Sequence, residues 1–132
     1  MALGMAAATR DDVTFWSTHL PATVASVPQA RRFAVEALHA LGQEGADEIA
    51  QLLVSEVATN AVVHACSPMR VSVWCHDGRA RVEVRDDDPT PPQEVVPDPM
   101  ACGGRGMMLV DTLSAAWGVN RNAWGKTVWF EL

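Results

Sequence analysis

The spacing of apolar and polar residues changes along the chain, and each change predicts a new element. Val13 to Leu20 reads as a strand or an extended segment. The stretch ASVPQARRFAVEALHALG has the punctuation of a helix, with Ser26 as N-cap, Pro28 in the first turn and Gly42 just past the end. A second helix is expected from about Ala46 to Ala65, before the sequence CSP.

Alternation with a period of two then predicts a hairpin. In MRVSVWCHDGRARVEVRD, apolar residues alternate with polar ones on both sides of Asp77-Gly78. That dipeptide between two alternating runs is a strong hairpin signal. The Pro-rich stretch DDPTPPQEVVPDPMAC that follows is too interrupted for a helix or a strand, and loops of such length inside compact domains are often functional lids.

The last part of the chain predicts one more helix and one more hairpin. GGRG opens a helix that is expected to reach about Ser114. Two strands follow, about Ala116 to Val119 and Lys126 to Leu132, with a turn near NRNAWG. This order of elements predicts an α+β fold with helices on one face of a mainly antiparallel sheet. We expect residues 1–12 to form a flexible extension and residues 13–132 a single domain.

Composition narrows the classes of function. The 132 residues suffice for one domain, and 48% hydrophobic residues can form a core. A formal charge of −6 argues against a nucleic-acid or anionic-membrane surface, and no run of about 18 apolar residues predicts a membrane span. The cysteines lack a Cys-x-x-Cys pair, which suits reduced thiols in the cytoplasm better than a disulfide framework or a zinc site.

Three polar residues interrupt the second helix at four-residue spacing: Glu56, Asn60 and His64. At about 100° per residue, they project from the apolar side of the helix and are expected to face inward. That side consists of Ile49, Leu52, Leu53, Val57 and Val63. An inward-facing carboxylate or amide needs a partner, because burying such a group unpaired is costly.

Two readings of these residues stay open. In the structural reading, Glu56 bonds a nearby arginine, Asn60 caps a loop, and His64 is a structural residue at the helix end. In the other reading, the residues face a cleft that holds a cation. An amide oxygen suits Mg²⁺, and a carboxylate can accept a proton from water or a hydroxyl. Phosphates would then complete the metal shell, which predicts a phosphate cradle elsewhere in the chain.

The sequence CGGRGMMLVDTL offers such a cradle, because glycines that include Gly104 and Gly106 precede an apolar helix. Glycines let a backbone approach an anion, and a helix N-terminus points N–H groups at it, while Arg105 can add positive charge. A flexible linker followed by a helix start is the alternative. GKT at 125–127, by contrast, is no P-loop, because position 120 is Asn120 and a strand follows.

An aspartate marks the end of the first hairpin. Asp86 closes the alternating run RVEVRD, at the point where the strand enters the long loop. An acceptor fixed at a strand end can read the amino group of an adenine. Asp87 and Asp88 beside it are read most simply as loop charges, with a Mg²⁺ role for the acidic trio as the alternative.

Four segments together resemble a known family. EVATNAVVHA, VEVRDDDPTPP, GGRGMMLVDTLSAAWGV and GKTVWFEL, in this order, resemble the histidine-kinase-like ATPase domains. Within them, the chain is most similar to the small bacterial anti-sigma-factor serine kinases and their stand-alone ATP-binding relatives. The resemblance covers roughly Ala22 to Leu132. It implies a Bergerat fold, a two-layer sandwich of a mixed, mainly antiparallel sheet and helices, with ATP between the long helix and an ATP lid at Asp87 to Cys102.

The resemblance also implies a role for each matching residue. Asn60 would bind the Mg²⁺ that bridges the triphosphate, and Glu56 would be the general base. Asp86 would read the adenine, and Thr127 would help to hold the adenine side of the nucleotide. The glycine box at the phosphates would consist of Gly104, Arg105 and Gly106. One departure concerns nucleotide affinity: Asp88 stands where the wider superfamily has a glycine that lets the backbone approach the base.

The leading expectation is therefore an ATP–Mg²⁺-binding regulator of the anti-sigma type. It would phosphorylate a serine or threonine of a small antagonist protein and sequester a sigma factor when free of that antagonist. A catalytically inactive nucleotide-binding interaction module is the alternative, and a degenerate scaffold without nucleotide is the third reading. Neither nucleic acid nor membrane is expected as a direct partner. Relatives of this kind often dimerise, so a homodimer is a further expectation.

Overall fold

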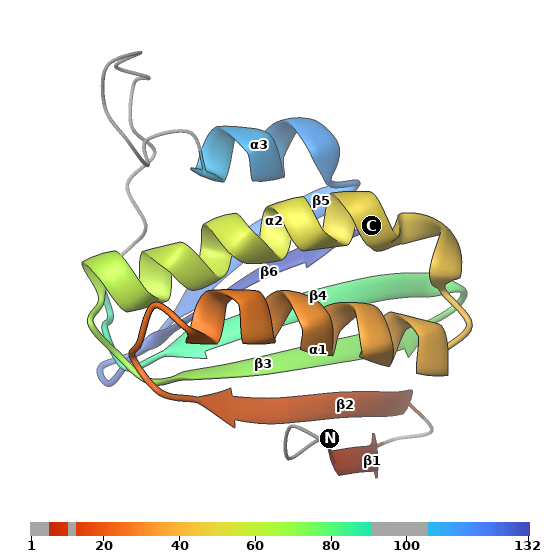
Figure 1. The fold of residues 1–132 in the computed structure, drawn as a ribbon, viewed down its shortest axis with the longest axis horizontal. Coiled ribbons are helices and arrows are strands. Elements are labelled where there is room, and N and C mark those ends of the chain that lie inside the picture. The colour runs from red at the N-terminus through yellow and green to blue at the C-terminus, as the bar shows by residue number, and fades with distance from the viewer. Residues whose placement is uncertain (1–5, 11–12, 91–105) are drawn as a thin grey trace.

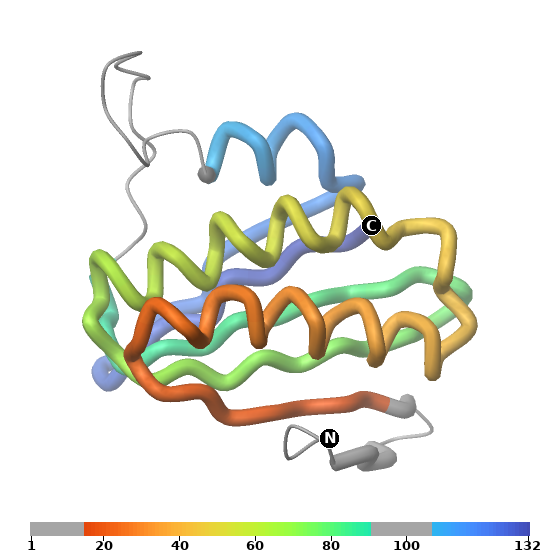
Figure 2. Tube along the Cα trace, in the orientation of Figure 1, coloured from red at the N-terminus to blue at the C-terminus, as the bar shows by residue number. Residues whose placement is uncertain are grey.

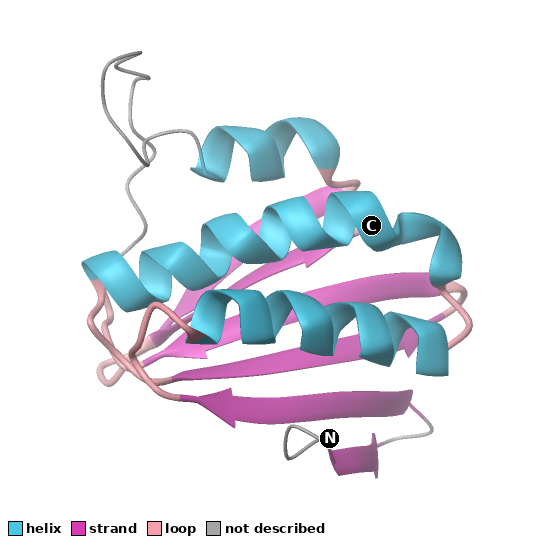
Figure 3. Cartoon of the chain, in the orientation of Figure 1, coloured by secondary structure: helices cyan, strands magenta, loops and turns pink. Residues whose placement is uncertain are grey.

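In the part of the chain that the structure describes, a six-stranded sheet and three α-helices make up the fold (Figure 1; Figure 3). The structure is a computed structural model that describes residues 6–10, 13–90 and 106–132. The strands are β1 (Ala6–Arg10), β2 (Val13–Leu20), β3 (Met69–His76), β4 (Arg79–Asp86), β5 (Ala116–Arg121) and β6 (Lys126–Glu131). The helices are α1 (Ser26–Ala40), α2 (Asp47–Thr59) and α3 (Gly106–Leu113), with a 3₁₀ turn at Glu44–Ala46 and a π-helical turn at Asn60–His64.

The sheet has the order β1-β2-β3-β4-β6-β5, and all five pairs of neighbouring described strands are antiparallel. The helices lie on one face of it, with α1 over β2 and β3, α2 beside α1, and α3 beyond α2 near β5 (Figure 2). The expected α+β class, with helices on one face of a mainly antiparallel sheet, is confirmed. None of the described helices is long and apolar enough to cross a membrane.

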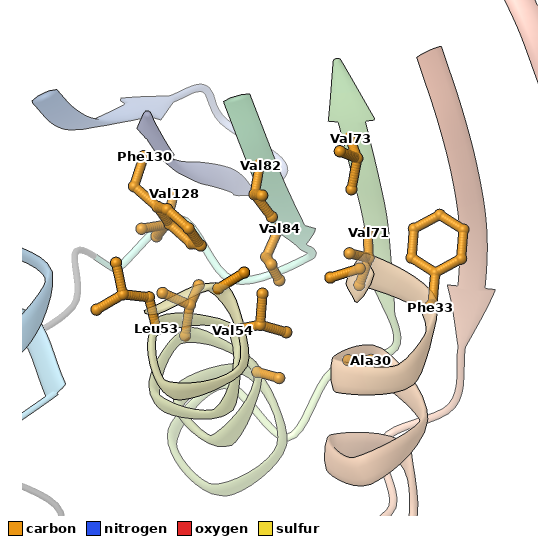
Figure 4. Packing of buried hydrophobic residues seen from close by; sticks show 14 of the residues in the cluster. Ala30, Phe33, Leu53, Val54, Val71, Val73, Val82, Val84, Val128 and Phe130 are labelled. Atoms are coloured by element: carbon orange, nitrogen blue, oxygen red, sulfur yellow. The ribbon is translucent and has the colours of Figure 1, made fainter. Parts of the chain in front are cut away.

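The core lies between the helices and the sheet. Phe33 of α1 and Leu53 and Val54 of α2 are fully buried against the valines of the central strands (Figure 4). The sheet side of the core consists of Val71, Val73, Val82, Val84, Val128 and Phe130. These residues follow the alternation in the sequence, because successive side chains of a strand point to opposite faces. The period-two pattern therefore predicted the correct inner face of β3 and β4.

Turn residues confirm the predicted hairpin and the end of the first helix. Asp77 and Gly78 have φ angles of 52° and 75°, as a two-residue turn with two left-handed residues requires. Gly42, with φ of 76°, follows α1. The amides of Gly42 and Gln43 donate to the carbonyls of His39 and Leu38, which completes a Schellman motif.

Two expectations near the N-terminus need correction. Ser26 is the first residue of α1 and does not cap it, because its hydroxyl donates to the carbonyl of Pro21 at 2.7 Å. Ala6–Arg10, expected within a loose extension, forms β1 and pairs with β2. The alanine-rich segment carries no alternating pattern, so only its backbone pairing at the sheet edge reveals it as a strand.

A histidine–aspartate pair joins the end of α1 to the start of α2. His39 Nε2 lies 2.6 Å from Asp47 Oδ2, and this hydrogen bond raises the pKa of His39 above its usual 6.5. The pair therefore stabilises the fold fully below pH 6.5, and this contribution is lost as the pH rises through the higher pKa of the folded state. We expect His39→Gln to lower the thermal unfolding midpoint at pH 6 more than at pH 9. A folded-state His39 pKa at or below the usual value, measured by NMR titration, would contradict this prediction.

Candidate functional site

The C-terminal end of the second helix departs from α-helical geometry at Asn60. The π-helical turn begins at this residue, whose carbonyl accepts the amide of Ala65 at 3.1 Å. Cys66 then takes a left-handed conformation with φ of 50°, which turns the chain toward β3. Single π-turns are uncommon in proteins, and those that occur are often found at functional sites. The extra residue lies after Asn60, which itself has α-helical φ and ψ angles of −59° and −42° and donates its N–H to the carbonyl of Glu56, so its side chain follows that of Glu56 at normal helical spacing.

Glu56 and Asn60 lie on a flank of α2 and not at the centre of its buried face. Both are half-buried, and His64 is exposed. The buried face of α2 and its π-turn consists of Ala50, Leu53, Val54, Val57, Ala58, Ala61 and Val62. Ile49, Leu52 and Val63, which were expected in the core, have exposed fractions of 40%, 40% and 56%. The expected inward direction is therefore corrected to a boundary position.

The reason for this difference is that α2 has two apolar stripes. One packs on the sheet, and the second, with Ile49 and Leu52, is half-open beside Glu56 and Asn60. Each residue turns about 100° around the helix axis, so the two stripes are neighbours on the helix surface. The average direction of all apolar side chains then falls between the two stripes and does not mark the buried face. The helix α3, which follows the glycine box, contacts α2.

No described residue forms a hydrogen bond or an ion pair with the side chains of Glu56 or Asn60. The structural reading, in which Glu56 bonds an arginine and Asn60 caps a loop, thus finds no support within residues 6–10, 13–90 and 106–132. A carboxylate and an amide oxygen form a hard donor set that suits Mg²⁺. The described part of the chain has no cluster of three acidic, histidine or cysteine residues that could hold a metal ion. A cation at Asn60 would therefore need further oxygens from a ligand such as a polyphosphate.

Asp86 ends β4 as a buried carboxylate with three polar contacts. Its side chain is 4% exposed, and that of Lys126, at the start of β6, is 6% exposed. Lys126 Nζ lies 2.9 Å from Asp86 Oδ2 and 3.1 Å from Oδ1. The amide of Asp88 donates to Oδ1 at 2.9 Å, and Lys126 Nζ also donates to the carbonyl of Asp88 at 3.0 Å. One ammonium group thus connects β6, the Asp86 carboxylate and the loop after it.

The register of the sheet separates Thr127 from Asp86. Asp86 pairs with Lys126, whereas Thr127 pairs with the exposed Arg85. Because side chains alternate along a strand, Lys126 shares the helix-facing side with Asp86, and Thr127 lies on the opposite side of the sheet. The structure therefore does not bring Thr127 beside Asp86. Lys126, which sequence reasoning missed, takes that place.

Gly125 allows the close approach of the two strands at this point. A Cβ atom at Gly125 would lie 2.2 Å from the carbonyl oxygen of Asp86, a distance that no larger residue could keep. In the sequence, Gly125 and Lys126 belonged to a false P-loop match and to the segment GKTVWFEL of the family resemblance, and neither was given a role. Lys126 is also the only lysine in the chain, which is the one signal that could have directed attention to it.

A serine connects the turn after α2 to the loop after β4. Ser67 is 4% exposed, accepts the amide of Asp87 at 2.8 Å and donates to the carbonyl of Pro68 at 2.7 Å. Its own amide donates to the carbonyl of Ala61 at 3.2 Å, within the π-turn that begins at Asn60. Two hydrogen-bonded steps therefore place the Asn60 turn and the Asp86 loop at the same end of the molecule.

The residue at the expected glycine position closes a small turn of its own. Asp88 Oδ1 accepts the backbone N–H of Thr90 at 2.8 Å, and this bond lowers the pKa of the Asp88 carboxyl below its usual value. The side chain is thus engaged within its own loop. Among the described residues, Asp87 and Asp88 belong to no group of three or more acidic, histidine or cysteine side chains that could hold a metal ion.

The predicted phosphate cradle lies largely outside the described residues. Gly104 and Arg105 belong to the undescribed segment 91–105, as does most of the expected lid. Gly106 is the first residue of α3. The roles of these three residues stay predictions.

Comparisons with known proteins identify a family and two solved structures to which the chain is similar. A family profile described as histidine kinase-like ATPase domain matches residues 20–132. The crystal structure of the RsbU and RsbW domains of Rv1364c from Mycobacterium tuberculosis is 21% identical with a TM-score of 0.63, over 87% of this chain and 31% of that one. A domain of a blue-light activated histidine kinase from Erythrobacter litoralis EL346 is 27% identical with a TM-score of 0.46, over 80% and 59% of the two chains.

The mycobacterial structure shows that the fold is shared, so the expected Bergerat-type sandwich is confirmed. This chain spans 31% of that longer chain. No curated protein sequence is significantly similar to it.

Proposed function

The chain belongs to the histidine kinase-like ATPase domain family, and on that premise we propose that it is an ATP–Mg²⁺-binding regulator of the anti-sigma kinase type. Its reaction would be the transfer of the γ-phosphoryl group of ATP to a serine or threonine of an antagonist protein. A sigma factor would be its second partner, sequestered when the antagonist is absent. The similarity to the mycobacterial structure, which contains an RsbW domain, supports this branch of the family.

The observation that carries the proposal is the pair of half-buried side chains on α2. Glu56 and Asn60 lie on one flank of α2, the helix that α3 contacts, and have no partner among the described residues. Both side chains reach the surface and are not tied to other described protein groups, so they are available to a ligand that binds on this flank. Asp86 at the same end of the molecule supplies the acceptor for an adenine amino group.

Each of these side chains has one task in the proposed reaction. Bound Mg²⁺ would neutralise the charge of the phosphates, and Asn60 would hold the ion through its amide oxygen. Glu56 would accept the proton of the attacking hydroxyl, which raises the nucleophilicity of that oxygen as the phosphoryl group leaves ATP. Phosphoryl transfer depends mainly on position and electrostatics, so the placement of Asn60 four residues after Glu56 on one helix matters together with its chemistry.

Titration calorimetry with Mg-ATP tests the nucleotide site. We expect the protein to bind Mg-ATP, and Asn60→Ala to weaken binding by about tenfold or more, because it removes a metal ligand. The matched control is Gln51→Ala, which removes an exposed amide from the same helix and should leave the affinity unchanged. Absence of binding by the intact protein would favour the reading as a scaffold without nucleotide. Binding without phosphotransfer would favour the interaction module.

A further inference from the structure

We propose that Lys126 is a second base-reading residue, which donates a hydrogen bond to ring atom N1 of the adenine while Asp86 accepts one from its amino group. This inference rests on the proposed function, since it describes how the same nucleotide site selects its base. It assigns a specificity role to a residue that the family resemblance did not single out.

The geometry places a donor and an acceptor side by side at the end of β4 and β6. Lys126 Nζ and Asp86 Oδ2 are 2.9 Å apart, and both side chains lie on the helix-facing side of the sheet. The 6-amino group and N1 of adenine are likewise a donor and an acceptor on neighbouring positions of one base edge. A base that presents this edge to the pair can form both hydrogen bonds at once.

Enough bonding capacity remains for both contacts. A carboxylate has about four lone-pair sites, of which Asp86 uses those toward Lys126 and the Asp88 amide. Oδ2 has Lys126 as its one described partner, so it can accept an amino hydrogen as well. The three hydrogens of the ammonium group face Oδ1, Oδ2 and the carbonyl of Asp88, and the one directed at Oδ1 can turn to N1, because the Asp88 amide still satisfies Oδ1.

Burial makes this pair selective. The side chains of Asp86 and Lys126 are 4% and 6% exposed, so a base must displace the atoms that cover them, and water then competes little for either group. A hydrogen bond from a charged donor in such surroundings contributes more than a neutral one, and its loss weakens binding by about ten- to a hundredfold. Replacing N1 of the base with a C–H group should therefore cost affinity, and the cost should depend on Lys126.

The alternative is that Lys126 is only the counter-ion of Asp86, or that it competes with the base for the carboxylate. In either case the base would not touch Nζ. A base without N1 would then bind as well as adenine, and removal of the lysine by Lys126→Met would leave the comparison between the two bases unchanged.

The test compares ATP, 1-deaza-ATP and 7-deaza-ATP by titration calorimetry. For the intact protein we expect 1-deaza-ATP to bind about ten- to a hundredfold more weakly than ATP. The control ligand 7-deaza-ATP lacks a nitrogen on another edge and should bind like ATP. For Lys126→Met we expect ATP and 1-deaza-ATP to bind equally. The control variant Arg121→Met removes the exposed cation that pairs with Lys126 in the β5–β6 register. It should keep the full difference in affinity between ATP and 1-deaza-ATP.

A second measurement works on the intact protein and does not depend on the folding of a variant. Because Lys126 is the only lysine, lysine-selective ¹⁵N labelling gives one side-chain ammonium signal. We expect ATP to shift this signal and 1-deaza-ATP to shift it much less. Equal affinities and an unmoved signal would overturn the role of Lys126 while leaving ATP binding in place. Failure of ATP itself to bind would overturn the proposed function, and this inference with it.

Discussion

Replacing Glu56 with glutamine is expected to lower the rate of phosphotransfer to the antagonist protein by about 10²- to 10⁴-fold, with little change in ATP affinity. Glutamine has nearly the same shape as glutamate but cannot accept the proton of the attacking hydroxyl. The half-buried position of Glu56 on α2, without a described protein partner, leaves its carboxylate available for this task. Single-turnover transfer of labelled phosphate from Mg-ATP to the antagonist measures the effect, because it isolates the chemical step from product release.

The matched control is Glu48→Gln, the same substitution at an exposed position of α2. It removes one negative charge from the helix and should leave the rate unchanged. If Glu56→Gln transferred phosphate as fast as the intact protein, the general-base role would be refuted. If it lost ATP binding to the same extent as Asn60→Ala, Glu56 would be a ligand of the metal or of the nucleotide and not the base.

Much of the fold follows from local signals in the sequence. The alternation around Asp77-Gly78 predicts two strands, their turn and their inner face, because each depends on residues close together in the chain. Gly42 similarly marks the end of α1 through its left-handed backbone. β1 could not be predicted in this way, since its pairing with β2 depends on the backbone and its alanines carry no pattern.

The candidate site could be predicted only in part, for a related reason. Glu56 and Asn60 share one helix, so their common flank follows from helical geometry, although the second apolar stripe of α2 misplaced the buried face. The partner of Asp86 depends instead on the β4–β6 register, which joins residues 40 positions apart. A shift of one residue in that register exchanges the faces, so the sequence alone does not show that Lys126 faces Asp86, and the role that the resemblance implies for Thr127 stays a prediction.

The buried pair also has a large expected effect on stability. Removing one partner of a buried ion pair leaves an uncompensated charge and costs about 3–5 kcal/mol, whereas replacing both partners can be nearly neutral. We therefore expect Lys126→Met to destabilise the fold by about this amount, since it leaves the Asp86 carboxylate 4% exposed without its cation. Urea denaturation measures the change, with the slope of the transition checked for two-state behaviour.

The double variant Asp86→Asn with Lys126→Met separates the loss of a charge partner from the loss of packing. We expect it to regain most of the stability that Lys126→Met loses, because no uncompensated charge is left in the buried site. Arg79→Met is the surface control: Arg79 lies 3.9 Å from Glu131 and is 71% exposed, so its loss should cost less than about 1 kcal/mol. A double variant as unstable as the sum of its single changes would show that the two side chains act independently. The ion pair would then not be what holds the Asp86 loop against β6.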